Sequence, residues 1–275
     1  MTFRKAGFAA ATALVLSLTA TACGGGSGSD DGKINIGIKF DQPGLGLKTQ
    51  DGKYTGFDVD VATYVAKELG YDEKDIVWKQ APSAERENMI ANGDVKFIVA
   101  TYTINDERKQ RVDFAGPYFL AHQDLLVRAD DDTVRTEGDL DSSEMKLCSV
   151  TGSTSAQNVK KDFAPKANLI NYGGYSECLT GLENKAVDAL TTDDSILAGY
   201  AAQKEHQGKF KLAGLSLSDE PYGIGLKKGD TELRKKINDA LKKMVDEGAW
   251  EEAAKKHFGP ADYEYEPAPE ITETN

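Results

Sequence analysis

The chain has 275 residues, a length more typical of two domains than of a single hydrophobic core. Hydrophobic residues make up 40% and charged residues 28% of the chain, and this average composition excludes a polytopic membrane protein and a wholly disordered chain. The net charge is −12 and no lysine or arginine cluster forms a basic face, so we expect no nucleic-acid partner.

Residues 1–22 have the layout of a secretory signal: two basic residues precede an uncharged, mostly apolar stretch of 17 residues. A membrane-spanning helix is one alternative, although 17 residues are few for a bilayer core of about 30 Å. The stretch leads into Ala20–Gly24, which resembles a bacterial lipobox except that Ala20 stands where leucine is usual. We expect a lipoprotein signal and a lipidated Cys23; ordinary cleaved secretion is the other alternative.

A glycine- and serine-rich segment follows the lipobox. Residues 24–31 read GGGSGSDD, a composition that forms a flexible coil and cannot pack. We expect residues 23–32 to be a linker that lets a folded protein float near the membrane holding its lipid.

From Lys33 onward the sequence predicts alternating strands and helices. The first half contains strands at 34–38, 76–78 and 97–100, and helices at 58–69, 85–91 and 107–112. The second half contains strands at 125–127, 147–150, 169–172, 189–192 and 222–226, and helices at 156–163, 178–184, 196–203, 233–245 and 249–257. Residues 263–275 hold four acids and two prolines, so we predict a disordered acidic tail.

Two successive sets of strands and helices imply two α/β domains with largely parallel sheets. Ligands of such sheets bind at the carboxyl ends of strands, often where two domains face each other. We therefore look for binding residues directly after the strands that end at Ile38, Ala100, Val150 and Thr192.

Two hydroxyls and an arginine follow the strand that ends at Ala100. Thr101 and Thr103 lie at the strand end, and Arg108 lies one helical turn into the next segment. The guanidinium is a planar fork of donors that suits a carboxylate. The structural alternative is a helix cap followed by a solvated surface arginine.

Hydroxyls and acids follow two strands of the second half. Ser153 and Thr154 come after Gly152, where free backbone N–H groups favour an anion; ordinary helix capping is the alternative. Asp193 and Asp194 follow Thr192, and only one of them is needed as a cap. Taken together, these strand ends describe a site for a small zwitterion, in which donors hold a carboxylate and an aspartate holds an ammonium group.

Two cysteines remain after Cys23. Outside the cytoplasm we expect Cys148 and Cys178 to pair, and in the chain-entropy model a loop of this length contributes about 3.5 kcal/mol. Two buried free thiols are the alternative. No histidine lies near either cysteine in the sequence, so we expect no metal site.

Three motifs resemble the extracellular solute-binding proteins, family 3, which are the polar-amino-acid receptors of ABC importers. They stand in family order and are Gly56–Val61 (GFDVDV), Glu107–Tyr118 (ER, then VDF and PY) and Pro221–Leu226 (PYGIGL). The likeness runs from about Lys33 to Phe258, and the stretch 36–47 is similar to Gram-positive glutamate-binding lipoproteins.

The resemblance implies a periplasmic-binding-protein-like α/β fold in which two lobes are joined by two hinge strands. Lobe one is expected at 33–121 together with 226–262, and lobe two at 122–225. Both cysteines of the expected pair then fall in lobe two, where a bridge does not block closure.

The resemblance also implies roles for residues at the motif positions. These roles are α-carboxylate binding for Arg108, Thr101, Thr103, Ser153 and Thr154, α-ammonium binding for Asp193, and packing on the aliphatic part of the ligand for Phe57. The chain departs from the usual family pattern at 39–45, so an aromatic lid is not implied there. From its place after the first strand, we predict that Lys39 binds a side-chain carboxylate; a solvated lysine on an exposed edge is the alternative.

We therefore expect a monomeric, lipid-anchored receptor at the extracellular face of the cell membrane. It binds an amino acid, with glutamate the leading ligand, needs no cofactor or metal, is not an enzyme, and has an ABC permease as its partner. The alternatives are an enzyme of the same fold, of the small-acid dehydratase type, and a ligand sensor for a signalling partner. An enzyme needs a general acid or base at the ligand, and His122, near the first hinge, is the histidine to test for that role.

Overall fold

The computed structural model describes residues 32–274. The predicted signal at 1–22, the predicted lipid site Cys23 and linker residues 23–31 lie outside the described residues. The strands are β1 (Ile34–Ile38), β2 (Asp41–Gln42), β3 (Gly46–Lys48), β4 (Tyr54–Thr55), β5 (Ile76–Gln80), β6 (Phe97–Ile98), β7 (Val112–Arg128), β8 (Lys146–Val150), β9 (Asn168–Tyr172), β10 (Ala189–Asp193), β11 (Phe210–Leu212) and β12 (Asp219–Lys227). The α-helices are α1 (Phe57–Glu68), α2 (Arg86–Asn92), α3 (Asp106–Lys109), α4 (Thr154–Asn158), α5 (Tyr175–Glu183), α6 (Asp194–Ala201), α7 (Thr231–Asp246) and α8 (Ala249–Phe258).

Two groups of strands share the long strand β7. In the first group β1 pairs in parallel with β5 and β6, and β12 pairs antiparallel with β6 and with residues 112–122 of β7. In the second group β8 pairs in parallel with β9 and β10, while β10 and β11 pair antiparallel with residues 123–128 of β7. Each group is thus a mixed sheet with two parallel and two antiparallel pairings, and not the largely parallel sheet that the sequence predicted. The predicted two-lobe α/β fold is confirmed.

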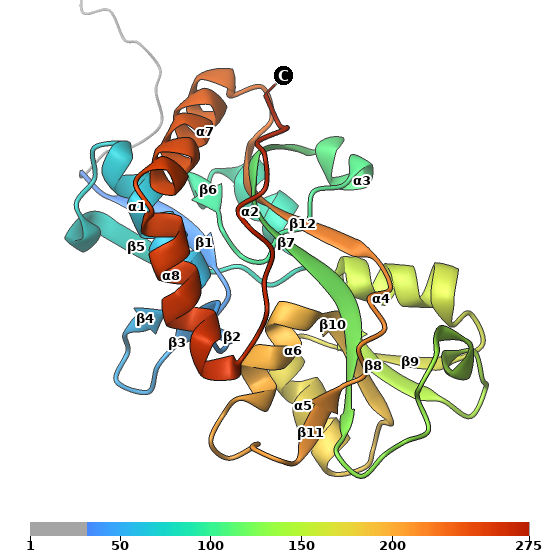
Figure 1. Ribbon diagram of the computed structural model, residues 1–275. Coiled ribbons are helices and arrows are strands. Elements are labelled where there is room, and N and C mark those ends of the chain that lie inside the picture. The colour runs from blue at the N-terminus through green and yellow to red at the C-terminus, as the bar shows by residue number, and fades with distance from the viewer. Residues whose placement is uncertain (1–31, 275) are drawn as a thin grey trace, which may run out of the picture. The chain divides into compact units, whose positions relative to one another are not determined.

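The strands β7 and β12 make the connection between the two groups (Figure 1). Their antiparallel pairing begins at Asp219 opposite His122 and ends at Lys227 opposite Val112. The buried side chains of β7 do not alternate with exposed ones, because helices or strands cover both of its faces along most of its length. These two neighbouring strands are the predicted hinge strands.

The predicted pair of cysteines is confirmed as a disulfide between Cys148 and Cys178. Cys148 lies in β8 and Cys178 in α5, so the bond fixes this helix to the sheet of the second group. The bond does not connect the two groups of strands.

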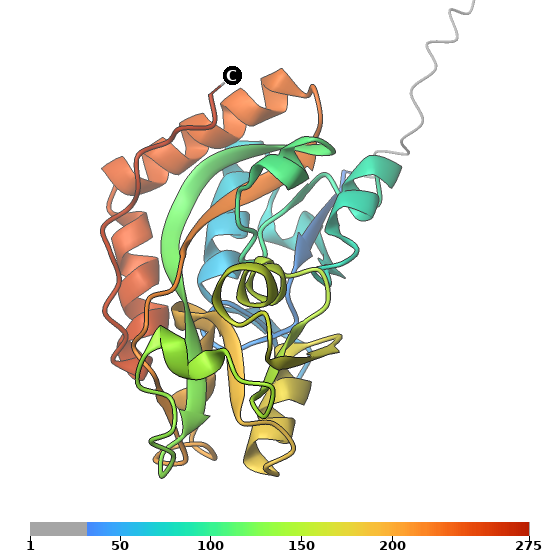
Figure 2. The same cartoon turned by 90° about the vertical axis from the view of Figure 1, so that its right-hand side faces the viewer.

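The prediction of a disordered tail is wrong for residues 263–274. This segment runs alongside α7 and α8 (Figure 2), where Asn238 Nδ2 of α7 donates to Glu273 O and the ring of Tyr265 lies 5.9 Å from that of Trp250 in α8. The Tyr263 hydroxyl donates to Asp194 Oδ1 at 2.8 Å. The tail is ordered because its apolar side chains pack on the core and its backbone pairs with Gly116 O.

Candidate functional site

The segment after β6 is held by a buried carboxylate. Thr101 has a φ of 46°, and its N–H donates to Asp58 Oδ2 at 2.9 Å. Asp58 also accepts from the Tyr118 hydroxyl at 2.7 Å, and burial raises the pKa of the Asp58 carboxyl to about 6. Two hydrogen bonds to one buried acid thus fix the backbone turn that presents Thr101 and Thr103.

Arg108 reaches from this segment to the opposite lobe. Its Nη1 donates to Thr103 O at 2.7 Å and its Nη2 to Gly152 O at 3.2 Å. The guanidinium carbon lies 5.0 Å from the centre of the Tyr102 ring, and the residue is 8% exposed. Arg108 is therefore a buried cation at the boundary between the lobes and not a solvated surface arginine.

The predicted hydroxyls of lobe two have different partners. Ser153 Oγ accepts from Ala156 N at 3.0 Å, which makes it the N-cap of α4. Thr154 Oγ1 donates to Glu220 Oε2 at 2.7 Å, and Thr103 Oγ1 of lobe one donates to the same oxygen at 2.7 Å. The structure thus brings Thr103 and Thr154 together around an acid that the sequence analysis did not single out.

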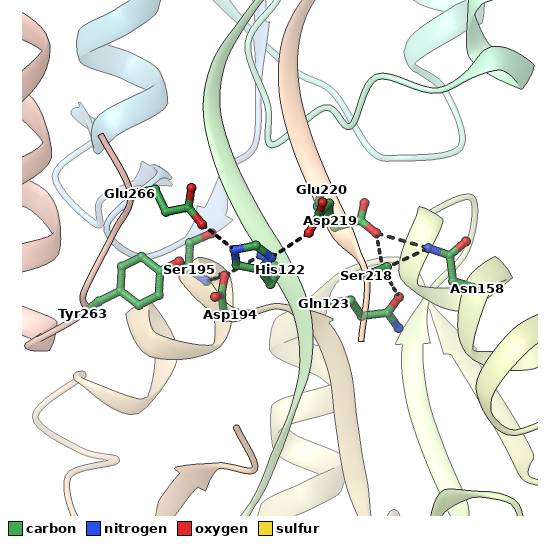
Figure 3. Close-up of polar contacts among 10 residues, drawn as sticks. All are labelled: His122, Gln123, Asn158, Asp194, Ser195, Ser218, Asp219, Glu220, Tyr263 and Glu266. Carbon is green, nitrogen blue, oxygen red and sulfur yellow. Dashed lines mark hydrogen bonds and ion pairs between the residues drawn. The ribbon is translucent and has the colours of Figure 1, made fainter. Parts of the chain in front are cut away.

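The two aspartates at the end of β10 and the start of α6 have different roles. Asp194 Oδ1 accepts from Ser195 N and His122 N, as well as from Tyr263 (Figure 3). Asp193 makes no capping bond; its carboxylate accepts from the Tyr222 hydroxyl at 2.6 Å and from Ser155 Oγ at 3.2 Å. Burial, and next the charge of Glu220, raise the pKa of the Asp193 carboxyl above its ordinary value. This buried acid is placed to attract an ammonium group.

Two further buried cations lie in the same region. Lys39 is 2% exposed, and its Nζ is 3.4 Å from Ser83 Oγ. Arg86 is also 2% exposed, and its Nη2 donates to the same hydroxyl at 3.0 Å. Burial and then the charge of Arg86 lower the pKa of Lys39 to about 8. Lys39 was predicted from the sequence, whereas Arg86 and Ser83 were not, although both follow the end of a strand, β5.

Two donors of this region lack partners within residues 32–274. They are Arg86 Nε and Gln42 Nε2, and both are buried. Neither Lys39 nor Arg86 forms an ion pair with a carboxylate anywhere in this part of the chain. Because buried donors are nearly always satisfied, this arrangement favours a ligand that brings acceptors.

The lobes approach each other closely around these residues. A Cβ on Gly152, which has a φ of +78°, would lie 2.8 Å from Ala84 Cα. A Cβ on Gly199 would lie 2.1 Å from the carbonyl oxygen of Pro43. The absence of a side chain at both positions permits the contact, so the structure represents a closed arrangement of the lobes.

The prediction that Phe57 packs on a ligand is wrong. Its ring is fully buried at the start of α1, with its centre 5.4 Å from Phe119, 5.6 Å from Trp250 and 5.2 Å from Phe258. Two other aromatic rings lie beside the cations: the centre of the Tyr102 ring is 4.8 Å from the guanidinium carbon of Arg86, and that of Tyr175 is 5.7 Å from Lys39 Nζ. Tyr175 follows the strand β9, a strand end that the sequence analysis did not search.

His122 lies outside the group of buried cations. Its ring nitrogens are 3.1 Å from Asp219 and 3.1 Å from Glu266, as Figure 3 shows. A cavity of about 670 Å³ is lined by His122 and Asp194, among others, but the half-buried Asp194 and the buried Asp124 already accept backbone N–H groups. Residues 32–274 contain no group of three His, Cys, Asp or Glu side chains placed to hold a metal, and no helix among them is long and apolar enough to cross a membrane.

Comparison with known proteins places this geometry in a family. The family of bacterial extracellular solute-binding proteins, family 3, matches residues 34–260. Glutamate-binding protein GluB of Corynebacterium efficiens is 46% identical over 239 residues, 84% of this chain and 80% of that protein. The glutamine-binding protein GlnH of the ABC transporter of Bacillus subtilis is 42% identical over 82% of this chain and 81% of its own length.

A solved structure agrees with the sequence relatives. An ancestral arginine-binding protein bound to glutamine is 34% identical, with a TM-score of 0.76 over 83% of this chain and 98% of its own. The family matches nearly all described residues, and this chain aligns with about four fifths of each of the two relatives. The chain therefore belongs to family 3 of the bacterial extracellular solute-binding proteins.

Proposed function

We propose that the protein is an extracellular receptor that captures L-glutamate by closing two lobes on it and delivers it to an ABC permease. The observation that carries the proposal is the pair of buried cations Lys39 and Arg86, which form no ion pair with a carboxylate within the described chain. Burying two cations without a direct ion pair is costly, and a ligand with a second carboxylate lowers that cost. The GluB and GlnH relatives support an amino acid as the ligand.

The three charged groups of glutamate each have a counterpart. Arg108 would hold the α-carboxylate, together with the polar segments around Thr101 and Ser153. Asp193 would hold the α-ammonium group, since its carboxylate is buried and accepts only neutral donors. Lys39 and Arg86 would hold the side-chain carboxylate. Neutral glutamine offers one acceptor oxygen to this last pair and leaves the cations uncompensated.

Closure is the proposed mechanism. We take lobe one as 33–121 with 226–262 and lobe two as 122–225, joined by β7 and β12. Ligand contacts from both lobes exist only in the closed arrangement, and that difference in binding free energy shifts the equilibrium toward closure.

A receptor fits the site better than an enzyme. His122 was the candidate for a general acid or base, but its ring is bonded to Asp219 and Glu266 and makes no contact with the buried cations. We propose neither catalysis nor a cofactor. A protein that reports ligand to a signalling partner would share the site, and transport of glutamate by cells distinguishes the two roles.

The proposal places the mature protein on the extracellular face of the cell membrane as a lipoprotein. Residues 1–22 would be removed as the signal, Cys23 would carry the lipid, and 23–32 would be the linker of a monomeric receptor. Cys23→Ala should leave the detergent phase of a two-phase extraction or accumulate unprocessed. Partitioning and processing both equal to those of the unaltered protein would indicate a spanning anchor instead.

Calorimetric titration of the chain from Gly32 onward tests the ligand directly. Glutamate, aspartate, glutamine, histidine and arginine are each added to the protein, which forms one compact unit from this residue. We expect glutamate to bind most tightly. Tighter binding of arginine or histidine would overturn the assignment of the cations to a ligand carboxylate.

Lys39→Gln should weaken glutamate far more than glutamine. Glutamate loses a desolvated charge pair, a loss on the order of 2–5 kcal/mol, whereas glutamine loses at most a neutral hydrogen bond. Titration of both ligands into both proteins measures the difference. Lys48→Gln is the control, because Lys48 lies nearby on β3 but is exposed. Equal losses for the two ligands would show that Lys39 does not select between them.

The lowered pKa of Lys39 predicts a pH dependence. Below pH 8 the amine is charged and can hold the side-chain carboxylate, while above pH 8 the free protein has lost the proton and glutamate binding must recover it. The ratio of the glutamate Kd to the glutamine Kd should therefore rise about tenfold from pH 7 to pH 9. Both ligands have an α-amino group, so the titration of that group affects both Kd values and cancels in their ratio. A constant ratio in the unaltered protein would contradict the prediction.

A further inference from the structure

We propose that Glu220 couples closure of the lobes to the ligand's ammonium group. Its carboxylate joins the two lobes, and its charge lies near Asp193, so closure without a cation between them is unfavourable. Glu220 is a positioning residue in this proposal and does not itself bind the ligand. The inference rests on the proposed capture of an amino acid by closure.

Four hydrogen bonds from different parts of the fold converge on Glu220, which is 1% exposed. Its Oε2 accepts from Thr103 of lobe one and from Thr154 of lobe two, each at 2.7 Å. Its Oε1 accepts from Asn158 Nδ2 at 3.1 Å and from Ser218 Oγ at 2.9 Å (Figure 3). Thr103 and Thr154 meet on one oxygen only when the lobes are closed.

These bonds also determine what Thr103 and Thr154 can offer a ligand. A hydroxyl has one proton, and both protons are directed at Glu220. The side chains of these two threonines therefore cannot donate to an α-carboxylate in this arrangement, and Arg108 is left as the main donor. Glu220 thus determines the orientation of two side chains that the sequence analysis assigned to the ligand.

The carboxylates of Glu220 and Asp193 lie close to each other. Glu220 and Tyr222 are two residues apart in β12 and so point to the same face, and the Tyr222 hydroxyl donates to Asp193. The neighbouring residues Thr154 and Ser155 of α4 donate to Glu220 and Asp193 respectively. Two acids are therefore held close together by adjacent donors, and Glu220 raises the pKa of Asp193 after burial does.

Within residues 32–274 neither acid forms an ion pair, because Glu220 accepts from hydroxyls and an amide and Asp193 only from hydroxyls, and the charge of Lys39 acts on Asp193 without a direct contact. Like charges in a buried site repel strongly, so the empty closed state is penalised. A ligand ammonium group beside Asp193 removes that penalty. The same residue thus stabilises the closed lobes and makes their closure depend on a positively charged group.

Two substitutions separate these roles. Glu220→Ala removes the acceptor and leaves buried donors unpaired, so the affinities for glutamate and glutamine should both fall on the order of 10- to 100-fold. Glu220→Gln keeps an acceptor and removes the charge. The empty Glu220→Gln protein should then be more closed in solution scattering, and its preference for glutamate over 2-oxoglutarate, which lacks the ammonium group, should fall about tenfold.

Asp219→Asn is the matched control. Asp219 is the adjacent acid on β12, but its side chain points to the other face and contacts His122 (Figure 3). The Asp219→Asn substitution should change neither the solution scattering of the empty protein nor its preference for glutamate over 2-oxoglutarate. If Glu220→Ala fails to fold, Asn158→Ala removes one donor of the same carboxylate and should weaken both ligands about fivefold.

The Glu220 variants can support or contradict the proposed coupling. If the Glu220 variants change only the melting temperature, or behave as Asp219→Asn does, Glu220 is a structural residue and the inference is wrong while glutamate capture stands. If the unaltered protein binds no amino acid, the proposed function and the inference both fail. Weaker binding by Glu220→Ala, together with a more closed and less selective Glu220→Gln, supports the coupling.

Discussion

Arg108→Ala is expected to abolish tight binding of every amino acid, at a cost on the order of 3–5 kcal/mol, which is about two to nearly four orders of magnitude in affinity. The guanidinium is 8% exposed and is fixed by bonds to Thr103 O and Gly152 O, so its remaining donors are already oriented. Alanine removes the fork and leaves the α-carboxylate desolvated without a cation. Because every amino acid has this carboxylate, glutamate and glutamine should lose affinity equally.

Two variants make the result specific. Arg108→Lys keeps the charge but loses the planar fork, and it should recover only part of the affinity. Arg111→Ala removes an exposed arginine three residues away, which donates to Asn88, and should bind as the unaltered protein does. Titration calorimetry measures all three, and thermal unfolding confirms that they fold. Binding of glutamate by Arg108→Ala within about threefold of the unaltered protein would remove Arg108 from the site.

The regular elements could be predicted because their apolar residues repeat with the period of the structure. The predicted helix at 58–69 lies within one residue of α1, and the strand at 34–38 is β1 itself. Only residues 125–127 of β7 were predicted as a strand from the sequence. The rest was missed because both faces of β7 are buried, which removes the alternation, and because Gly116 and Pro117 interrupt it. The short strands β2, β3 and β4 were missed since two or three residues show no period.

The candidate site was predictable where a binding residue follows a searched strand. Lys39, Thr101 and Asp193 were found in this way, and all three are buried. Arg86 and Tyr175 follow the outer strands β5 and β9, whose positions in the sheets the sequence does not reveal. Glu220 was missed for a different reason: it lies at the start of a hinge strand, where only the assembled lobes bring Thr103 and Thr154 to it.

Truncation after Asp262 is expected to lower the free energy of unfolding by about 4 kcal/mol, although the segment looked disordered by composition. Its tyrosines alternate with glutamates, and in the structure Tyr263 and Tyr265 are half-buried while Glu264 and Glu266 are exposed. This alternation of tyrosine and glutamate indicates a segment with one face packed on the protein. The acidic and proline-rich composition of the segment suggested disorder instead. Removing the segment uncovers Trp250 and Phe258, which are 3% and 2% exposed, and these are large apolar side chains.

The loss should have a second source in the polar contacts of the tail. Lys109 Nζ lies 2.6 Å from Glu273 Oε1, and both Thr272 N and Glu273 N donate to Gly116 O at 3.0 Å. Urea unfolding of the truncated and full chains from Gly32 measures the change, with Glu270→Gln as a control at an exposed tail position. Equal unfolding midpoints would mean that the tail does not cover the core in solution. A lower midpoint with glutamate still bound would show that residues 263–274 stabilise the fold from outside the ligand site.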